Sequence, residues 1–202
     1  MSAPKTLLEM AGAQSRPAPL SSAALVIIDA QREYVDGLLP LSGITPALEQ
    51  IAALLARARA AGTPVIHIVH RGMPGGAFDP GRDGFAIADA AAPEAGEPII
   101  EKQLPNAFAG TDLAEKLADT GRSDMIVAGF MTHMCISSTV RAALDHGFRT
   151  TVVADAVTTR DLPDPRGGVV SADTVNAVSL AALSDRFACV APLDRIPDGH
   201  DG

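Results

Sequence analysis

The stretch MIVAGFMTHMCISSTVRAALDHG, residues 125–147, decides the fold predicted from this sequence. It begins with the apolar run 125–129, which is typical of a buried strand. A short turn then leads into a helical pattern over 135–145, which Gly147 ends. A strand that leads directly into a helix is the repeating unit of α/β proteins with parallel sheets.

The same alternation of apolar runs and helical stretches continues on both sides of this unit. It predicts a doubly wound, six-stranded and mainly parallel sheet with helices on both faces. A long loop rich in Gly, Pro and Ala is expected over 71–97, and loops of that length are often functional. The expected strands are 24–28, 64–69, 98–101, 125–129, 150–154 and 187–191, and the expected helices are 45–61, 110–120, 135–145 and 171–184.

Composition and length are typical of a single globular domain with an aliphatic core. Of the 202 residues, 47 % are apolar and 20 % are charged, whereas aromatic residues make up only 3 % and Trp is absent. Such a composition suits a parallel sheet covered by Ala-rich helices. We expect an N-terminal arm over residues 1–20 and one domain over residues 21–202.

Charge and hydropathy argue against several classes of partner. The net charge of −8 would repel nucleic acid and anionic membrane surfaces. The longest apolar runs are strand-sized, far short of the roughly 20 residues of a membrane span. Residues 1–20 lack the apolar core of an export signal, so the sequence predicts a cytoplasmic protein with free thiols at Cys135 and Cys189.

Reactive residues follow four of the expected strands. They are Asp29, His70, Lys102 and Cys135, the last of which comes six residues after Gly129. In open parallel sheets, ligands bind beyond the carboxyl ends of the strands. We therefore expect these four side chains to face the same edge of the sheet.

Cys135 opens an expected helix, where partial positive charge and free N–H groups can lower a thiol pKa and bind an oxyanion. The alternative is a buried structural cysteine. Lys102 can stabilise a thiolate by its charge, or it can be a surface residue on an edge strand. Asp29 ends an apolar run, where it can pair with a lysine and transfer protons, or cap a turn.

The histidines do not predict a metal site. His67 and His70 are three residues apart on a strand, so they point to opposite faces and cannot bind one ion. His70 and His133 can line a pocket, or they can simply hydrogen-bond to their neighbours. Asp155 is expected to end the fifth strand and to serve in a turn, and Cys189 is expected in the core.

The most distinctive motif is AGFMTHMCISST at residues 128–139. Further matching segments are 25–29 with Gln31, Glu101-Lys102 with 106–108, 141–143, and 153–156. Together these segments resemble the isochorismatase-like cysteine hydrolases over about residues 21–191.

The resemblance implies a Rossmann-like sheet with Asp29, Lys102 and Cys135 as catalytic residues. It implies a cis peptide bond between Phe130 and Met131, with the N–H groups of Met131 and Cys135 binding the oxyanion. It also implies hydrolysis of a small-molecule amide through a thioester at Cys135, without a cofactor, in a homo-oligomer that is a dimer or larger. After His70, the metal-binding Asp and His residues of the nicotinamidase branch are not found.

The identity of the substrate is not encoded in any recognisable motif. Two alternatives to the amide hydrolase stay open, namely an ether or ester hydrolase in which Cys135 is secondary, and a non-catalytic or redox-sensing oligomeric protein. The candidate substrate-binding residues are Tyr34, His70, Phe108, Phe130 and His133, with Phe78 and Phe85 as further aromatic candidates.

Overall fold

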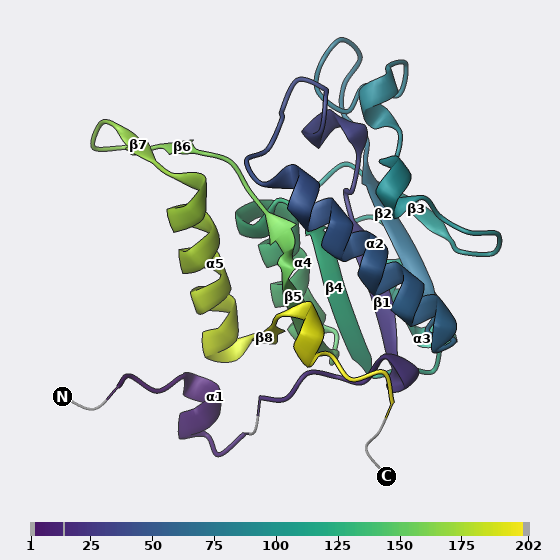
Figure 1. Cartoon of the computed structure of the whole chain (residues 1–202), viewed down its shortest axis with the longest axis vertical. Helices are drawn as coiled ribbons and strands as arrows, with labels where there is room; N and C mark the ends of the chain where they lie inside the picture. Colours follow the sequence, from purple (N-terminus) through teal and green to yellow (C-terminus); the bar gives the residue numbers. More distant parts are fainter. Residues whose placement is uncertain (1–2, 14, 200–202) are drawn as a thin grey trace.

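The centre of the computed structural model, which describes residues 3–13 and 15–199, is a six-stranded parallel sheet (Figure 1). The strand order is β3-β2-β1-β4-β5-β8, and every neighbouring pair runs parallel. The doubly wound α/β fold predicted from the sequence is therefore confirmed. The strands are β1 (Ala23–Ile28), β2 (Val65–His70), β3 (Ile99–Lys102), β4 (Asp124–Phe130), β5 (Arg149–Thr158) and β8 (Ala188–Ala191).

Helices cover both faces of the sheet, and this explains why every residue of β1 is apolar. Leu25 and Ile27 of β1 pack into one core beneath α2, whereas Val26 and Ile28 pack into a second core beneath α3, α4 and α5. A strand buried on both faces reads as a continuous apolar run rather than as an alternating one. The helices are α1 (Leu7–Met10), α2 (Ile44–Ala60), α3 (Leu113–Asp119), α4 (Ser137–Asp145) and α5 (Ala172–Arg186).

Three segments differ from the expected boundaries. A π-helical turn, Thr132–Ile136, precedes α4, so Cys135 lies before the helix that it was expected to open. The long loop 71–97 contains two short 3-10 turns, Asp83–Phe85 and Asp89–Ala91. An unpredicted two-stranded hairpin, β6 (Leu162–Pro163) with β7 (Val169–Val170), projects between β5 and α5 in Figure 1.

The prediction that Asp155 ends the fifth strand is wrong, because β5 continues to Thr158. The pairing with β4 is irregular here: Val127 pairs with Val152, but Gly129 pairs with Val157. The extra residues of β5 form a bulge. In this bulge the Asp155 carboxylate accepts a hydrogen bond from the backbone N–H of Leu193, at 3.0 Å.

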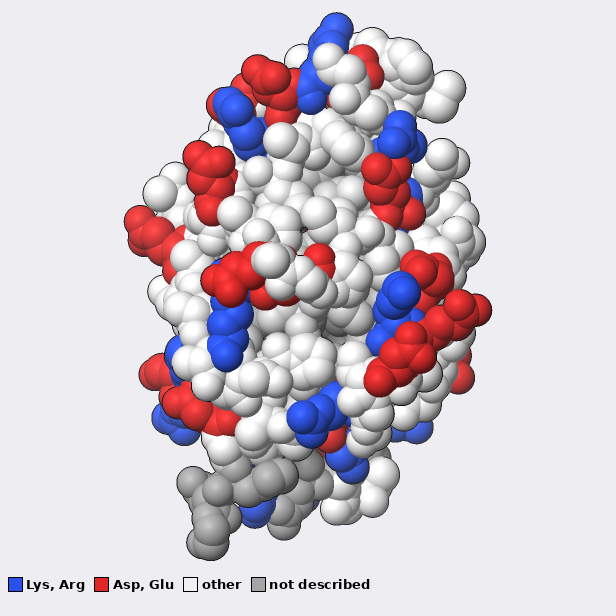
Figure 2. Space-filling view, turned by 90° about the vertical axis from the view of Figure 1, so that its right-hand side faces the viewer, with Lys and Arg blue, Asp and Glu red and all other residues white. Residues whose placement is uncertain are grey.

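The N-terminal segment crosses the amino edge of the sheet, at the bottom of Figure 1. The N–H of Leu7 donates to the Asp185 carboxylate of α5 at 2.9 Å, and the N–H of Ala18 donates to the Thr151 hydroxyl at 3.0 Å. Among the described helices, none combines the length and the apolar character required to cross a membrane. Acidic and basic side chains lie close together over the face shown in Figure 2, so the surface charge there is compensated locally.

Gly129 allows β1 and β4 to approach each other at the edge that carries the reactive residues. Its φ is 120°, and a Cβ at this position would collide with the backbone carbonyl oxygen of Ile28. Gly147 also has a positive φ of 83°, but a Cβ there would have no neighbour within 4 Å.

We expect Gly129→Ala to destabilise the protein far more than Gly147→Ala. The left-handed backbone alone costs about 1 to 2 kcal/mol for a residue with a Cβ. The collision in Gly129→Ala adds a packing cost, which gives about 3 kcal/mol or more in total. Urea denaturation of both variants measures this difference in the free energy of unfolding. Equal losses would show that the contact with Ile28 is unimportant.

Candidate active site

Three side chains from separate strands meet at the carboxyl edge of the sheet. Asp29 follows β1, Lys102 ends β3, and Cys135 lies in the turn after β4. The Lys102 Nζ lies 2.7 Å from the Asp29 Oδ2 and 3.2 Å from the Cys135 Sγ. The side chains of Asp29 and Lys102 are fully buried, and Cys135 is 5 % exposed. The cluster is therefore closed off from bulk solvent.

The Asp29 carboxylate is held in place by an unusual backbone and by a single cation. Its φ of 51° lies in the left-handed region, which few residues other than Gly, Asn and Asp occupy. Its backbone N–H donates to the carbonyl of Ile68 at 2.9 Å, which anchors the turn to β2. Burial raises the pKa of Asp29, whereas the Lys102 ammonium acts to lower it. Within the described residues neither Asp29 oxygen has a hydrogen-bond partner, so Oδ2 meets Lys102 as an ion pair and Oδ1 is available to accept a proton.

The Cys135 thiol is neutral in this environment. Burial, and then the nearby Asp29 carboxylate, raise the pKa of Cys135 to about 12, although the Lys102 ammonium acts to lower it. The expectation that the turn lowers this pKa is wrong for the free protein, because it neglected the burial of the sulfur. A neutral thiol has to lose its proton as it reacts, and the nearest carboxylate is that of Asp29.

The turn that carries Cys135 begins at a cis peptide bond between Phe130 and Met131, the position that the sequence resemblance implied. The Met131 carbonyl accepts hydrogen bonds from the N–H groups of Met134, at 3.0 Å, and Ile136, at 3.2 Å. The Thr132 hydroxyl donates to the carbonyl of Thr158 at the end of β5, at 3.1 Å. π-helical turns of this kind are rare and occur frequently at functional sites.

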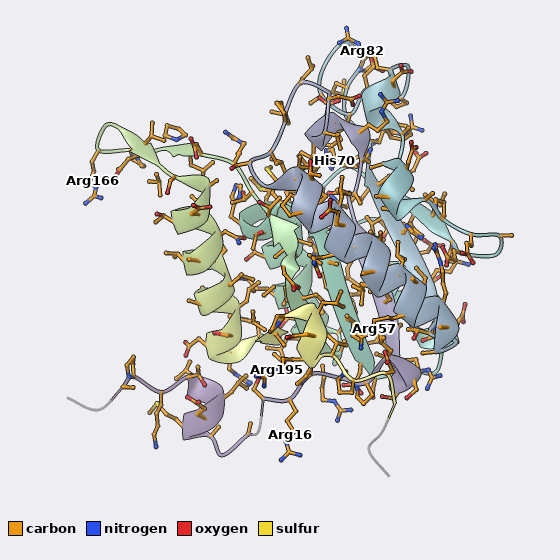
Figure 3. All side chains as sticks on the ribbon, in the orientation of Figure 1. Arg16, Arg57, His70, Arg82, Arg166 and Arg195 are labelled. Carbon is orange, nitrogen blue, oxygen red and sulfur yellow. The ribbon has the colours of Figure 1, made fainter. Side chains whose placement is uncertain are left out.

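His70 joins the cluster through Lys102. Its Nδ1 lies 3.3 Å from the Lys102 Nζ. Burial, and then the charge of Lys102, lower the pKa of His70 to about 4, so the imidazole is neutral near pH 7. In Figure 3, His70 lies near the end of the sheet opposite to Arg16 and Arg195.

Gln31, which the sequence analysis named only as part of the family resemblance, holds the backbone of His70 in place. It is fully buried, and its side chain bonds both backbone groups of His70, accepting from the N–H at 2.8 Å and donating to the carbonyl at 3.0 Å. Its amide also donates to the carbonyl of Phe85 in the long loop, at 2.8 Å. The sequence signal for this role was an amide side chain two residues after Asp29, just after the apolar run of β1.

Aromatic rings pack beside the cluster on one side. Tyr34 meets Phe78 edge-on at 5.1 Å between ring centroids and Phe130 at 5.9 Å, and Phe78 meets His70 edge-on at 5.1 Å. Burial, and then the Asp29 carboxylate, raise the pKa of the Tyr34 hydroxyl. Tyr34 and Phe130 are therefore close to the cluster, as the sequence suggested.

Phe108 does not join the cluster. Its ring stacks on His146 at 4.5 Å and on Phe148 at 6.2 Å, at the end of α4 that is remote from Cys135. The geometry therefore gives no support to its selection as a substrate contact. Phe85 lies beneath the guanidinium of Arg71, 5.5 Å from its ring centroid.

The remaining histidines lie outside the cluster. The Nδ1 of His133 lies 2.6 Å from the Thr159 hydroxyl, and burial together with the charge of Arg160 lowers its pKa. The Nε2 of His67 lies 2.9 Å from the Glu97 carboxylate, in a separate buried network. Among residues 3–13 and 15–199, no three or more His, Cys, Asp or Glu side chains gather in a way that could hold a metal ion.

A cavity of about 380 Å³ adjoins the cluster beyond the end of β3. Its lining includes Lys102 itself and the exposed ion pair of Arg71 with Glu101, whose closest atoms are 2.6 Å apart. The other lining residues are Gln103, Leu104, Ala109 and Gly110. This cavity brings solvent closest to the Lys102 side of the cluster.

The chain is similar to known proteins over most of its length. Residues 23–187 match a family model described as the isochorismatase domain. A secreted isochorismatase effector of Verticillium dahliae is 38 % identical over 88 % of this chain and 92 % of its own length. The maleamate amidohydrolase of Pseudomonas putida is 37 % identical over 66 % of this chain and 71 % of its own. A crystal structure described as an isochorismatase from Pseudomonas putida matches with a TM-score of 0.92 and 45 % identity, and covers 96 % of this chain and 100 % of that one.

We expect Cys135 to be alkylated slowly at neutral pH, because its thiol is protonated there. The alkylation rate should rise only as the pH approaches about 12. Removal of the neighbouring negative charge in Asp29→Asn should lower the pKa of Cys135 and accelerate alkylation near pH 7. Iodoacetamide labelling across pH, read by peptide mass, measures both effects, with Cys189 in the same molecule as the internal control.

An apparent pKa of Cys135 below that of an ordinary free thiol, about 8.5, would contradict this picture. So would an Asp29→Asn variant whose Cys135 reacts more slowly than that of the unmodified protein.

Proposed function

The chain belongs to the isochorismatase family, and within this family we propose that it is a cysteine hydrolase of small-molecule amides. The observation that carries the proposal is the buried contact of Lys102 with both Asp29 and Cys135, at 2.7 and 3.2 Å. A nucleophile, a proton acceptor and a cation within hydrogen-bonding reach of one another are the elements of covalent catalysis. Maleamate amidohydrolase, which is similar over two thirds of this chain, is named for cleaving an amide.

In the first half of the proposed reaction, the Cys135 Sγ attacks the amide carbonyl carbon as its proton passes to Asp29. Lys102 stabilises the negative charge that develops on the sulfur. The backbone N–H groups of Met131 and Cys135 bind the oxyanion of the tetrahedral intermediate. The C–N bond then breaks, and the amine or ammonia leaves with the proton that Asp29 received, so that a thioester remains on Cys135.

In the second half, a water molecule gives a proton to Asp29 and attacks the thioester carbonyl. The C–S bond breaks, a carboxylic acid is released, and Cys135 recovers a proton. The neutral resting thiol supplies the proton that Asp29 accepts, and the Lys102 ammonium favours the ionised carboxylate that accepts it. Asp29 acts alternately as general base and general acid, and its last step returns the proton to Cys135.

Arg160 favours an amide substrate that also carries a carboxylate. It follows β5 at the carboxyl edge of the sheet, and its side chain is exposed. Its positive charge acts to lower the pKa values of both His133 and Tyr34, which supports a position on their side of the cluster. Within the described chain no carboxylate forms an ion pair with it. The guanidinium donates to the backbone carbonyl of Asp161 at 3.2 Å, and its remaining N–H groups are suited to bind an anionic substrate group.

We expect the protein to release ammonia from maleamate, and Cys135→Ala to lower kcat by at least about 10³-fold because the nucleophile is lost. Cys189→Ala, which removes the other thiol, should retain full activity. An enzymatic ammonia assay measures these rates. Hydrolysis of a vinyl ether such as isochorismate that survives Cys135→Ala would instead support the ether-hydrolase alternative.

We also expect Arg160→Gln to raise KM for maleamate by about 10- to 100-fold, the value of one charge-assisted hydrogen bond. For maleamide, the neutral diamide of the same shape, the two proteins should have similar KM values. Steady-state kinetics with both amides measures the difference. An equal effect on the two substrates would show that Arg160 does not recognise the carboxylate.

A further inference from the structure

We propose that His70 is a positioning residue, whose Nδ1 accepts a hydrogen bond from Lys102 and fixes the ammonium between Asp29 and Cys135. This inference rests on the proposed function and deepens it. The sequence suggested that His70 could line a pocket and contact substrate, or hydrogen-bond to its neighbours. The structure places its ring nitrogen 3.3 Å from the ammonium.

The ammonium of Lys102 has three N–H donors, and three acceptors surround it. The Asp29 Oδ2 forms an ion pair with it at 2.7 Å, and the Cys135 Sγ at 3.2 Å and the His70 Nδ1 at 3.3 Å are its hydrogen-bond partners. A lysine ammonium has no more donors than this. His70 therefore completes the hydrogen bonding of a buried cation, which without it would leave one N–H unpaired in a dry site.

The sheet delivers His70 to this position. His70 is the last residue of β2, Lys102 is the last residue of β3, and the two are direct partners in the parallel register of these strands. Gln31 then holds the backbone of His70 from the other side, through both its N–H and its carbonyl. Phe78 packs edge-on against the imidazole and limits its rotation. Groups placed on strands and held by such contacts are positioned more precisely than groups on loops.

The imidazole is in the state that this role requires. With the ring neutral and its proton on Nε2, Nδ1 carries a lone pair directed at Lys102. The ammonium itself opposes protonation of the ring, because a second positive charge at 3.3 Å would be repelled. The contact with Lys102 thus keeps the imidazole neutral, and only a neutral imidazole can accept this hydrogen bond.

Loss of this acceptor should affect the chemical step more than substrate binding. Lys102 would be free to turn fully toward Asp29, and its contact with the Cys135 sulfur would weaken. The developing thiolate would then be less stabilised, although Arg160, the residue proposed to bind the substrate carboxylate, is unchanged. The expected signature is a lower kcat with little change in KM.

The test compares His70→Leu, which lacks an acceptor, with His70→Asn, whose side-chain oxygen can occupy the position of Nδ1. His146→Leu, at the far end of α4, is the matched control. We expect His70→Leu to lower kcat for maleamate by about 10-fold or more, with KM within about 3-fold, because one hydrogen bond to a charged group is lost. His70→Asn should recover most of the loss, and His146→Leu should behave like the unmodified protein.

A second measurement does not depend on the substrate. In His70→Leu the weaker contact with Lys102 should slow iodoacetamide labelling of Cys135 at about pH 9, relative to Cys189, and His70→Asn should restore the rate. If the protein hydrolyses no amide but labelling follows this pattern, the proposed function fails while the positioning role stands. Unchanged labelling and kcat in His70→Leu would overturn the positioning role. So would a raised KM at constant kcat, since it would make His70 a substrate contact.

Discussion

The rest of the structure depends on one buried ammonium. Lys102 is fully enclosed, and a buried cation is tolerated only when it is paired and hydrogen-bonded. Its partners come from the ends of β1, β2 and β4, so three strand-to-loop junctions must converge within a few ångströms of the end of β3. The strand order β3-β2-β1-β4 achieves this, because it makes these four strands consecutive neighbours.

Much of this arrangement was predictable from the sequence because it follows from strand ends. The continuous apolar run of β1 indicates a strand buried on both faces, and such strands in parallel sheets carry their ligand-binding residues beyond their carboxyl ends. Asp29, His70, Lys102 and Cys135 each follow or end a strand, and the structure brings all four together. The family resemblance predicted the cis bond between Phe130 and Met131, which the strand pattern alone does not contain.

Other features depend on how deeply a side chain is buried and on packing between distant segments. Local sequence patterns indicate neither. The sequence shows that Cys135 follows a strand, but not that its sulfur is buried beside a carboxylate, so the direction of its pKa shift was misjudged. Phe108 is close to Lys102 in the sequence, yet its ring packs on residues that follow α4. The bulge of β5 and the β6–β7 hairpin depend on pairing between distant segments. A cytoplasmic location and a homo-oligomeric state stay predictions.

The burial and the protonation of the Cys135 thiol also determine how readily it is oxidised. Peroxides attack thiolates that solvent can reach, and they convert them stepwise to sulfenic, sulfinic and sulfonic acids. Cys135 is 5 % exposed and protonated at rest, so it lacks both properties that make a cysteine vulnerable. In the proposed mechanism the thiolate forms only when substrate arrives, so Cys135 is spared this damage between turnovers. The same burial argues against the redox-sensing alternative for Cys135.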